Sequence, residues 1–240
     1  MDPAGPPLTF FEHLEEFRHR LLISVAAVAA GTFVGYFFSD RALRFFLRPI
    51  REEIGQAYFF SPAEAFVVKL KTAMLLGVLL SAPVLFSQFW FFISPALFHK
   101  EKKFFLALVG ITSILFLSGA LLCFYEVLPV ALRFLVGMRS DYLAPMISIT
   151  EYVSFLTGMS LAFGVAFNLP VVILGLVKAG VLNSKMLNHY QRHAVVLIFI
   201  LAAILTPGPD IASQFMLAVP LLVLFEASVF LAALIEGRKP

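Results

Sequence analysis

A chain of 240 residues, of which 60% are hydrophobic and only 14% charged, carries more apolar surface than a water-soluble domain of this size needs for its core. Its net charge of +3 comes from dispersed basic residues and not from one basic, aromatic-rich surface, which argues against nucleic-acid binding. The sequence therefore predicts an all-α integral membrane protein.

Six apolar runs are candidates to cross about 30 Å of hydrocarbon, the fifth and sixth of them shorter than usual. They cover residues 21–38, 66–92, 104–124, 151–177, 194–206 and 212–235. The first run resembles a cleavable signal, since Arg18 and Arg20 precede it, but five further runs follow it. We expect residues 1–240 to form a single membrane domain of six bent helices around a concavity.

The basic residues give a moderate indication of orientation. An even number of spans places both termini on one side, which holds Arg18, Arg20, Lys100, Lys102, Lys103, Lys178, Lys185, Arg192, Arg238 and Lys239. The opposite loops hold Arg41, Arg44, Arg48, Arg51, Arg133 and Arg139. Because positively charged loops tend to remain in the cytoplasm, this distribution favours cytoplasmic termini.

Two stretches beside the first span have the spacing of short interfacial helices. Residues 9–20 set apolar positions against acidic ones and lead into the span. Between the first two spans, arginines recur from Arg41 to Arg51 at intervals of three and four, which places them on one helical face near lipid phosphates. We expect this helix to stop near Pro49 or Gly55, and a long loop at 125–150 with Ser148 or Thr150 as the cap of the fourth span.

Span five and the prolines are the features most relevant to helix geometry. From Ala194 to Thr206 a helix is only about 20 Å long, and the following turn sends the chain straight back into span six. Such a short hairpin must thin the bilayer, recruit a partner or place polar ends inside the membrane. Pro83, Pro170 and Pro220 each remove a backbone donor and are expected to bend their helices.

The pattern does not favour an enzyme. All five histidines fall in or beside loops on the terminal side, and no GxxxxGK[ST] phosphate loop occurs. His189 and His193 have the spacing of a metal pair, but no glutamate or cysteine lies near them in the sequence, so we favour interfacial solvation. We expect no metal and no cofactor.

Polar residues inside the spans are few, and each needs a partner. Asn168, just before Pro170, has two comparable interpretations: a hydrogen bond to carbonyls released by the proline, or a place in a polar groove. Gln214 and Glu226 lie in span six, and we favour a structural role for Glu226 at the terminal-side boundary.

Three carboxylates, Glu15, Glu16 and Glu101, lie on the terminal side of the membrane. They have two interpretations. One is ordinary pairing with nearby Arg18, Arg20 and Lys102, which contributes less than about 1 kcal/mol when exposed. The other is a pair of carboxylates that grips incoming guanidinium groups, since a carboxylate beside apolar residues binds cations more strongly than in bulk water.

Five motifs carry a resemblance that extends from about residue 9 to residue 235. They are HLEEFRHRLL at 13–22, SPAEAFVVKLK at 61–71, SAPVLFSQFWFFISPALFHKEKK at 81–103, AFGVAFNLP at 162–170 and LTPGPDIASQ at 205–214. Together they closely resemble the TatC family of twin-arginine translocase subunits. The resemblance implies a cup-shaped protein of the cytoplasmic membrane with both termini inside, which serves as receptor and assembly core for export of folded proteins.

The resemblance also implies a binding site and partners. Signal peptides with consecutive arginines would contact Glu16 and Glu101, with Phe92 and Pro95 shaping the site and Lys102 and Lys103 beside it. The single-span subunits TatA and TatB would dock on spans five and six, where Thr206 and Gln214 offer polar contacts. Self-association, contact with membrane lipids and use of the proton-motive force are further expectations.

One departure from the family concerns Asn168, where many relatives have a glutamate, so a role that requires a proton or charge there is not expected. Two rival classes remain at this point. A secondary transporter would need two matching halves, which are not visible in the sequence. A structural membrane scaffold without a ligand is not distinguished by composition.

Overall fold

The structure is a computed structural model that describes residues 10–53, 55–97, 102–137, 146–178, 180–205 and 211–236. Its elements are α1 (Phe10–Phe46), α2 (Arg48–Glu53), α3 (Glu64–Leu97), α4 (Lys102–Leu122), the π-helical turn η1 (Cys123–Val127), α5 (Leu128–Gly137), α6 (Ile149–Ala166), α7 (Leu169–Lys178), α8 (Ser184–His189), α9 (Gln191–Leu205) and α10 (Ile211–Glu236). Five helical stretches are long and apolar enough to cross a membrane, and the sixth, Gln191–Ile204, is apolar but shorter. The prediction of an all-α, multi-pass membrane protein is confirmed.

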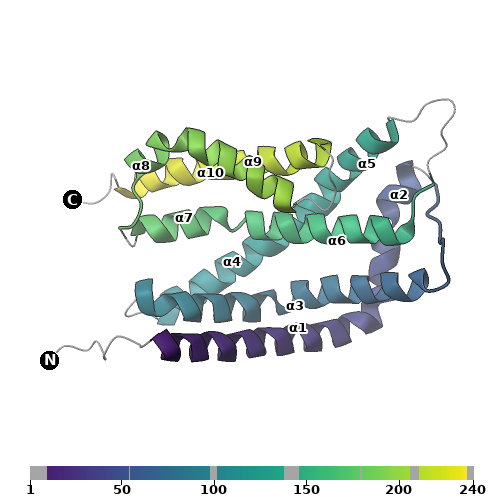
Figure 1. Cartoon of the computed structure of the whole chain (residues 1–240), viewed down its shortest axis with the longest axis horizontal. Helices are drawn as coiled ribbons and strands as arrows, with labels where there is room; N and C mark the ends of the chain where they lie inside the picture. Colours follow the sequence, from purple (N-terminus) through teal and green to yellow (C-terminus); the bar gives the residue numbers. More distant parts are fainter. Residues whose placement is uncertain are drawn as a thin grey trace.

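The helices form successive layers (Figure 1). Helices α1 and α3 lie side by side along one edge, α6 and α7 follow, and the α9–α10 hairpin lies along the opposite edge, while α4 and α5 cross behind them. Helix α1 begins and α10 ends at the same end of the molecule, which we call the terminal end. Helix α2, the end of α5 and the starts of α3 and α6 lie at the opposite end, which we call the far end.

Helix α1 is longer than the sequence indicated. The expected interfacial segment at 9–20 and the span at 21–38 join in one continuous helix, because neither glycine nor proline interrupts the helical pattern between them. The chain then turns at Leu47, and α2 follows with Pro49 near its start, a position that proline tolerates. Gly55, with a φ of +96°, comes shortly after α2 and donates its N–H to the carbonyl of Ile50 at 3.1 Å.

The prediction of a loop at 125–150 is wrong for the first half of that range. Helix α4 continues through η1 into α5 and ends only at Gly137, because the residues after Val127 remain largely apolar and helical in pattern. Pro129 falls in the first turn of α5, just after the π-helical turn, where hydrogen bonding is already irregular and its missing N–H costs least.

The prolines act differently from one another. Pro83 and Pro220 lie inside the continuous helices α3 and α10, whereas the span containing Pro170 breaks into α6 and α7 at Phe167 and Asn168. Helix α3 also continues past Pro95 to Leu97, beyond the end that the sequence suggested.

A short backbone connection closes the far end. Tyr58 donates its N–H to the carbonyl of Ile147 at 3.0 Å, and Ile149 donates to the carbonyl of Tyr58 at 3.1 Å. Ser148 caps α6 by accepting from the N–H of Glu151, so Ser148 and not Thr150 is the cap. This link fixes the segment before α3 against the start of α6.

Candidate functional site

A groove between α1 and α3 opens near the terminal end, and we call it the terminal groove. Its volume is about 180 Å³, and it is lined by Phe17, Arg20, Leu21, Ser24, Leu85, Gln88, Phe89 and Phe92. All of these residues come from α1 and α3, whose backbones are in direct contact further along at Gly31 and Gly77. The close packing of these two helices therefore fixes the relative positions of the two walls.

The two adjacent glutamates of α1 have different environments. Glu15 is exposed, whereas the side chain of Glu16 is only 22% exposed. Successive helical residues point about 100° apart, so only one of two neighbours can face α3. The helix therefore places Glu16 beside the groove and leaves Glu15 exposed.

Glu16 already has a partner within α1. Arg20 donates from Nε to Oε1 of Glu16 at 3.0 Å and from Nη2 to the same oxygen. Among the described residues, the second oxygen, Oε2, has the Nδ1 of His13 near it, at 3.9 Å, which is beyond hydrogen-bonding distance. One face of the carboxylate is therefore held by Arg20, and the other retains acceptor capacity for a further donor.

Aromatic rings surround this ion pair. The ring of Phe92 from α3 stacks on His13 with centroids 4.5 Å apart, and Phe17 meets Phe92 edge-on at 5.5 Å. The guanidinium of Arg20 lies 5.2 Å from the ring centroid of Phe91. Such rings reduce local access of water and attract cations to their faces, so both effects favour a bound guanidinium here.

The remaining predicted residues of this site lie where α3 ends and α4 begins. Pro95 is in the last turn of α3, and Lys102 and Lys103 are the first residues of α4, although their side chains are not among those described. Glu101 lies outside the described residues. The rings of Phe91 and Phe105, 4.2 Å apart, hold the end of α3 against the start of α4.

Asn168 lies away from this groove, at the break between α6 and α7. Its backbone N–H donates to Val165 at 3.0 Å in place of the usual α-helical acceptor, and its side-chain Nδ2 donates to the carbonyl of Gly164 at 3.0 Å. The side chain thus bonds the carbonyl that the backbone N–H of Asn168 leaves free. This resembles the first interpretation of Asn168, a hydrogen bond to a carbonyl released by Pro170. Its Oδ1 is buried and has no hydrogen-bond partner among the described residues.

Gln214 makes a hydrogen bond inside the hairpin. Its side-chain Nε2 donates to the carbonyl of Phe199 in α9 at 3.0 Å, which uses one of the two hydrogens on that nitrogen. The second hydrogen and the side-chain oxygen keep the capacity to bond a partner helix. Thr206, the other predicted docking residue, lies outside the described residues.

Glu226 lies beside the start of α9, where it accepts a hydrogen bond from Nε2 of Gln191. This position agrees with a boundary role. His189 and His193 both contact the ring of Tyr190. Among the residues that the structure describes, no group of three or more His, Cys, Asp or Glu is arranged to hold a metal ion.

Sequence reasoning missed the contribution of His13. Its ring covers Phe92 and its Nδ1 faces Glu16, and the signal was available in the spacing, since His13, Glu16 and Phe17 recur at three and four residues. The contact with α3, however, joins residues far apart in the chain.

Comparison with known proteins decides the family. A family model described as "Sec-independent protein translocase protein (TatC)" matches residues 12–220, which include both walls of the terminal groove. The chain belongs to the TatC family. It is 39% identical to the Sec-independent protein translocase protein TatC of Carboxydothermus hydrogenoformans, over 97% of this chain and 96% of that protein.

Other relatives agree with this membership. The TatC protein of Aquifex aeolicus is 36% identical, over 97% of each chain. A crystal structure of the twin arginine translocase receptor TatC superposes with a TM-score of 0.81 at 36% identity, and covers 93% of this chain and 99% of the other. The chain is accordingly a multi-pass membrane protein and a transport component of the TatC family.

Proposed function

We propose that this chain is the receptor subunit of a twin-arginine protein translocase, and that its terminal groove binds signal peptides with consecutive arginines. The observation that supports this proposal is the state of Glu16: it is a half-buried carboxylate beside the ring of Phe92, with one oxygen held by Arg20 and the other without a hydrogen bond among the described residues. A guanidinium has the right chemistry for that open oxygen, because it donates from a planar fork and stacks on aromatic faces.

Arg20 shapes how such a peptide would bind. It orients the Glu16 carboxylate, and it packs over Phe91, so it remains in place when a second guanidinium approaches Oε2. We propose that Glu101, next to Lys102, supplies the second carboxylate for the second arginine, with Phe92 and Pro95 shaping the site and Lys102 and Lys103 flanking it. Lysines in the peptide would bind less tightly, because an ammonium is a point charge without a fork.

Orientation, partners and energy source complete the proposal. The terminal end would face the cytoplasm, in the cytoplasmic membrane, so that signal peptides reach the groove before export. The single-span subunits TatA and TatB would dock on the α9–α10 hairpin around Thr206 and Gln214, further copies of this chain would join the assembly, and the proton-motive force would drive transport.

The test is binding of a labelled twin-arginine signal peptide to the purified protein, beside the same peptide with both arginines replaced by lysine. We expect Glu16→Gln and Glu101→Gln each to weaken twin-arginine binding about tenfold or more, since each removes a charge-assisted hydrogen bond of roughly 1.5–3 kcal/mol.

Glu15→Gln is the matched control, because it removes the same charge from the exposed neighbour of Glu16. It is expected to bind nearly as wild type. Wild-type affinity in both Glu16→Gln and Glu101→Gln would refute the site, and an equal loss in Glu15→Gln would show that net charge and not the groove matters. A secondary transporter or a ligand-free scaffold would not distinguish the two peptides.

A further inference from the structure

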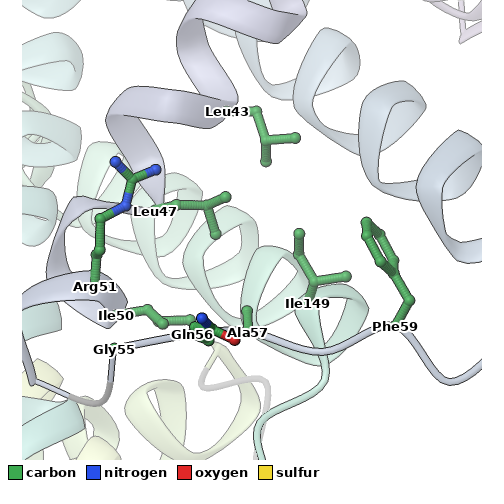
Figure 2. Close-up of a pocket in the computed structure, with 9 residues that line it drawn as sticks. All are labelled: Leu43, Leu47, Ile50, Arg51, Gly55, Gln56, Ala57, Phe59 and Ile149. Atoms are coloured by element: carbon green, nitrogen blue, oxygen red, sulfur yellow. The ribbon is translucent and has the colours of Figure 1, made fainter.

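A second pocket lies at the far end, away from the terminal groove, and we call it the far-end pocket. It is lined by Leu43, Leu47, Ile50, Arg51, Gly55, Gln56, Ala57, Phe59 and Ile149. Its volume is about 350 Å³, within the range of about 300–1,000 Å³ that is usual for ligand sites. Figure 2 shows these residues around a common space, with the ribbons of neighbouring helices behind it.

One wall of the far-end pocket is a stripe along the end of α1 and α2. The helical bonding continues through the turn between them, since Leu47 donates to the carbonyl of Leu43 at 2.9 Å and Arg51 donates to that of Leu47 at 3.0 Å. Residues four apart share a helical face, so Leu43, Leu47 and Arg51 line the pocket in a row. The row therefore consists of two apolar side chains followed by one guanidinium.

The charged side chain that lines this pocket is that of Arg51. Arg51 is exposed and has no ion pair among the described residues. Two acids of the neighbouring segments are engaged elsewhere, since Asp40 binds Lys69 at 2.9 Å and Glu53 binds Arg133 at 3.0 Å. Glu52, next to Arg51, is exposed and does not line the pocket. An anionic group at the rim would find a free guanidinium there.

The lining of the pocket, apolar along one wall with one guanidinium beside it, favours an occupant that is part apolar and part anionic. A soluble anion would pair with Arg51 and leave the apolar wall of Leu43, Leu47, Phe59 and Ile149 unused. An acyl chain joined to a phosphate head group matches both the apolar wall and the guanidinium of Arg51.

We propose that the far-end pocket binds one anionic phospholipid, with part of an acyl chain between Leu47 and Ile149 and its phosphate on Arg51. The Gln56 side chain, which lies on the floor of the pocket in Figure 2, offers amide donors to the same head group. This site is independent of signal-peptide binding, because it uses the opposite end of α1. The bound lipid holds the end of α1, the segment before α3 and the start of α6 together.

The experiment is native mass spectrometry of the full chain, delipidated in a neutral detergent and titrated with dioleoyl phosphatidylglycerol, dioleoyl phosphatidylcholine or glycerol phosphate. The wild-type protein is expected to bind the first lipid about tenfold more tightly than the second, because only the first has a net negative charge to pair with Arg51. Arg51→Gln should abolish that preference, and Ala57→Phe, which fills the pocket, should weaken binding of both lipids.

Arg48→Gln is the matched control. It removes the same charge three residues away, but the Arg48 guanidinium lies over the ring of Phe45, 5.6 Å from its centroid, and does not line the pocket. Its lipid preference should equal that of wild type. The thermal unfolding midpoint of each variant confirms folding.

Three results would overturn the proposal. They are equal binding of the two lipids by wild type, an unchanged preference in Arg51→Gln, and binding of glycerol phosphate as tight as that of the lipid. The last would show an anion site that makes no use of the apolar wall.

Discussion

At the scale of single residues, the structure gives neighbouring or similar polar groups different roles. Glu16 borders the terminal groove while Glu15 is exposed, and Arg51 lines the far-end pocket while Arg48 stacks on Phe45. In each pair the charge is the same and only the surroundings of the side chain differ. These pairs therefore provide variants that change position without changing chemistry.

Tyr152 offers a test of stability at this scale. Its hydroxyl is buried in α6 and donates to the carbonyl of Phe46, the last residue of α1, at 2.6 Å. Tyr152→Phe leaves that carbonyl without this donor, and we expect a loss of about 1–3 kcal/mol in the free energy of unfolding. Thermal or denaturant unfolding in detergent would measure it. An unchanged free energy would mean that the carbonyl finds another donor when the hydroxyl is gone.

At the scale of elements, the contact between α1 and α3 depends on glycine. A Cβ at Gly31 would lie 2.7 Å from the carbonyl oxygen of Gly77, and one at Gly35 would lie 2.8 Å from that of Ala73. The GTFVG sequence at 31–35 is a GxxxG motif, which in membranes permits helices to approach at backbone distance. This close approach fixes the two walls of the terminal groove.

Gly77→Ala should separate these helices. The added Cβ would lie 2.6 Å from the backbone nitrogen of Thr32, so a helix must move, and we expect a loss of about 1–3 kcal/mol in the free energy of unfolding with weaker signal-peptide binding. Gly110→Ala in α4 is the control, because a Cβ added there would have nothing within 4 Å and alanine favours a helix by up to about 1 kcal/mol. Equal effects of the two substitutions would contradict the role of the contact.

The α9–α10 hairpin is the other element that matters for function. Helix α9 has 15 residues, or about 22 Å, and α10 extends beyond it to contact α8, where Ser184 donates its N–H to Glu236 at 3.1 Å. Figure 1 shows that the hairpin stops short of the far end that α3, α5 and α6 reach. A span this short must thin the bilayer beside it, recruit a partner or place polar ends inside the membrane.

Because one hydrogen on Nε2 of Gln214 is bonded to Phe199, docking of a partner helix at this position would use the side-chain oxygen or the second hydrogen. We expect Gln214→Leu to lower co-purification of the single-span subunits severalfold while signal-peptide binding persists. Recovery equal to wild type would mean that Gln214 only joins α10 to α9, and that the docking surface lies elsewhere.

At the scale of the whole molecule, charge and helix order give a topology that can be measured. Arg44 lies near the far end of α1, and Lys185 is exposed on α8 at the terminal end. In a Cys123→Ala background, a membrane-impermeant thiol reagent applied to intact cells should label Arg44→Cys and leave Lys185→Cys unlabelled. The reverse pattern would place the terminal groove outside the cytoplasm and refute its role as a receptor for signal peptides before export.

Local patterns in the chain were enough to predict the membrane class, the helical fold, the approximate spans and the end of the molecule that carries Glu16. These follow from the length of apolar runs and from charge, which are properties of neighbouring residues. Packing was needed to establish which of Glu15 and Glu16 meets α3 and that Gln214 is bonded to Phe199. It also created the far-end pocket, whose walls come from α1, α2, the segment before α3 and the start of α6. Those features depend on how helices distant in sequence pack together, which local patterns do not encode.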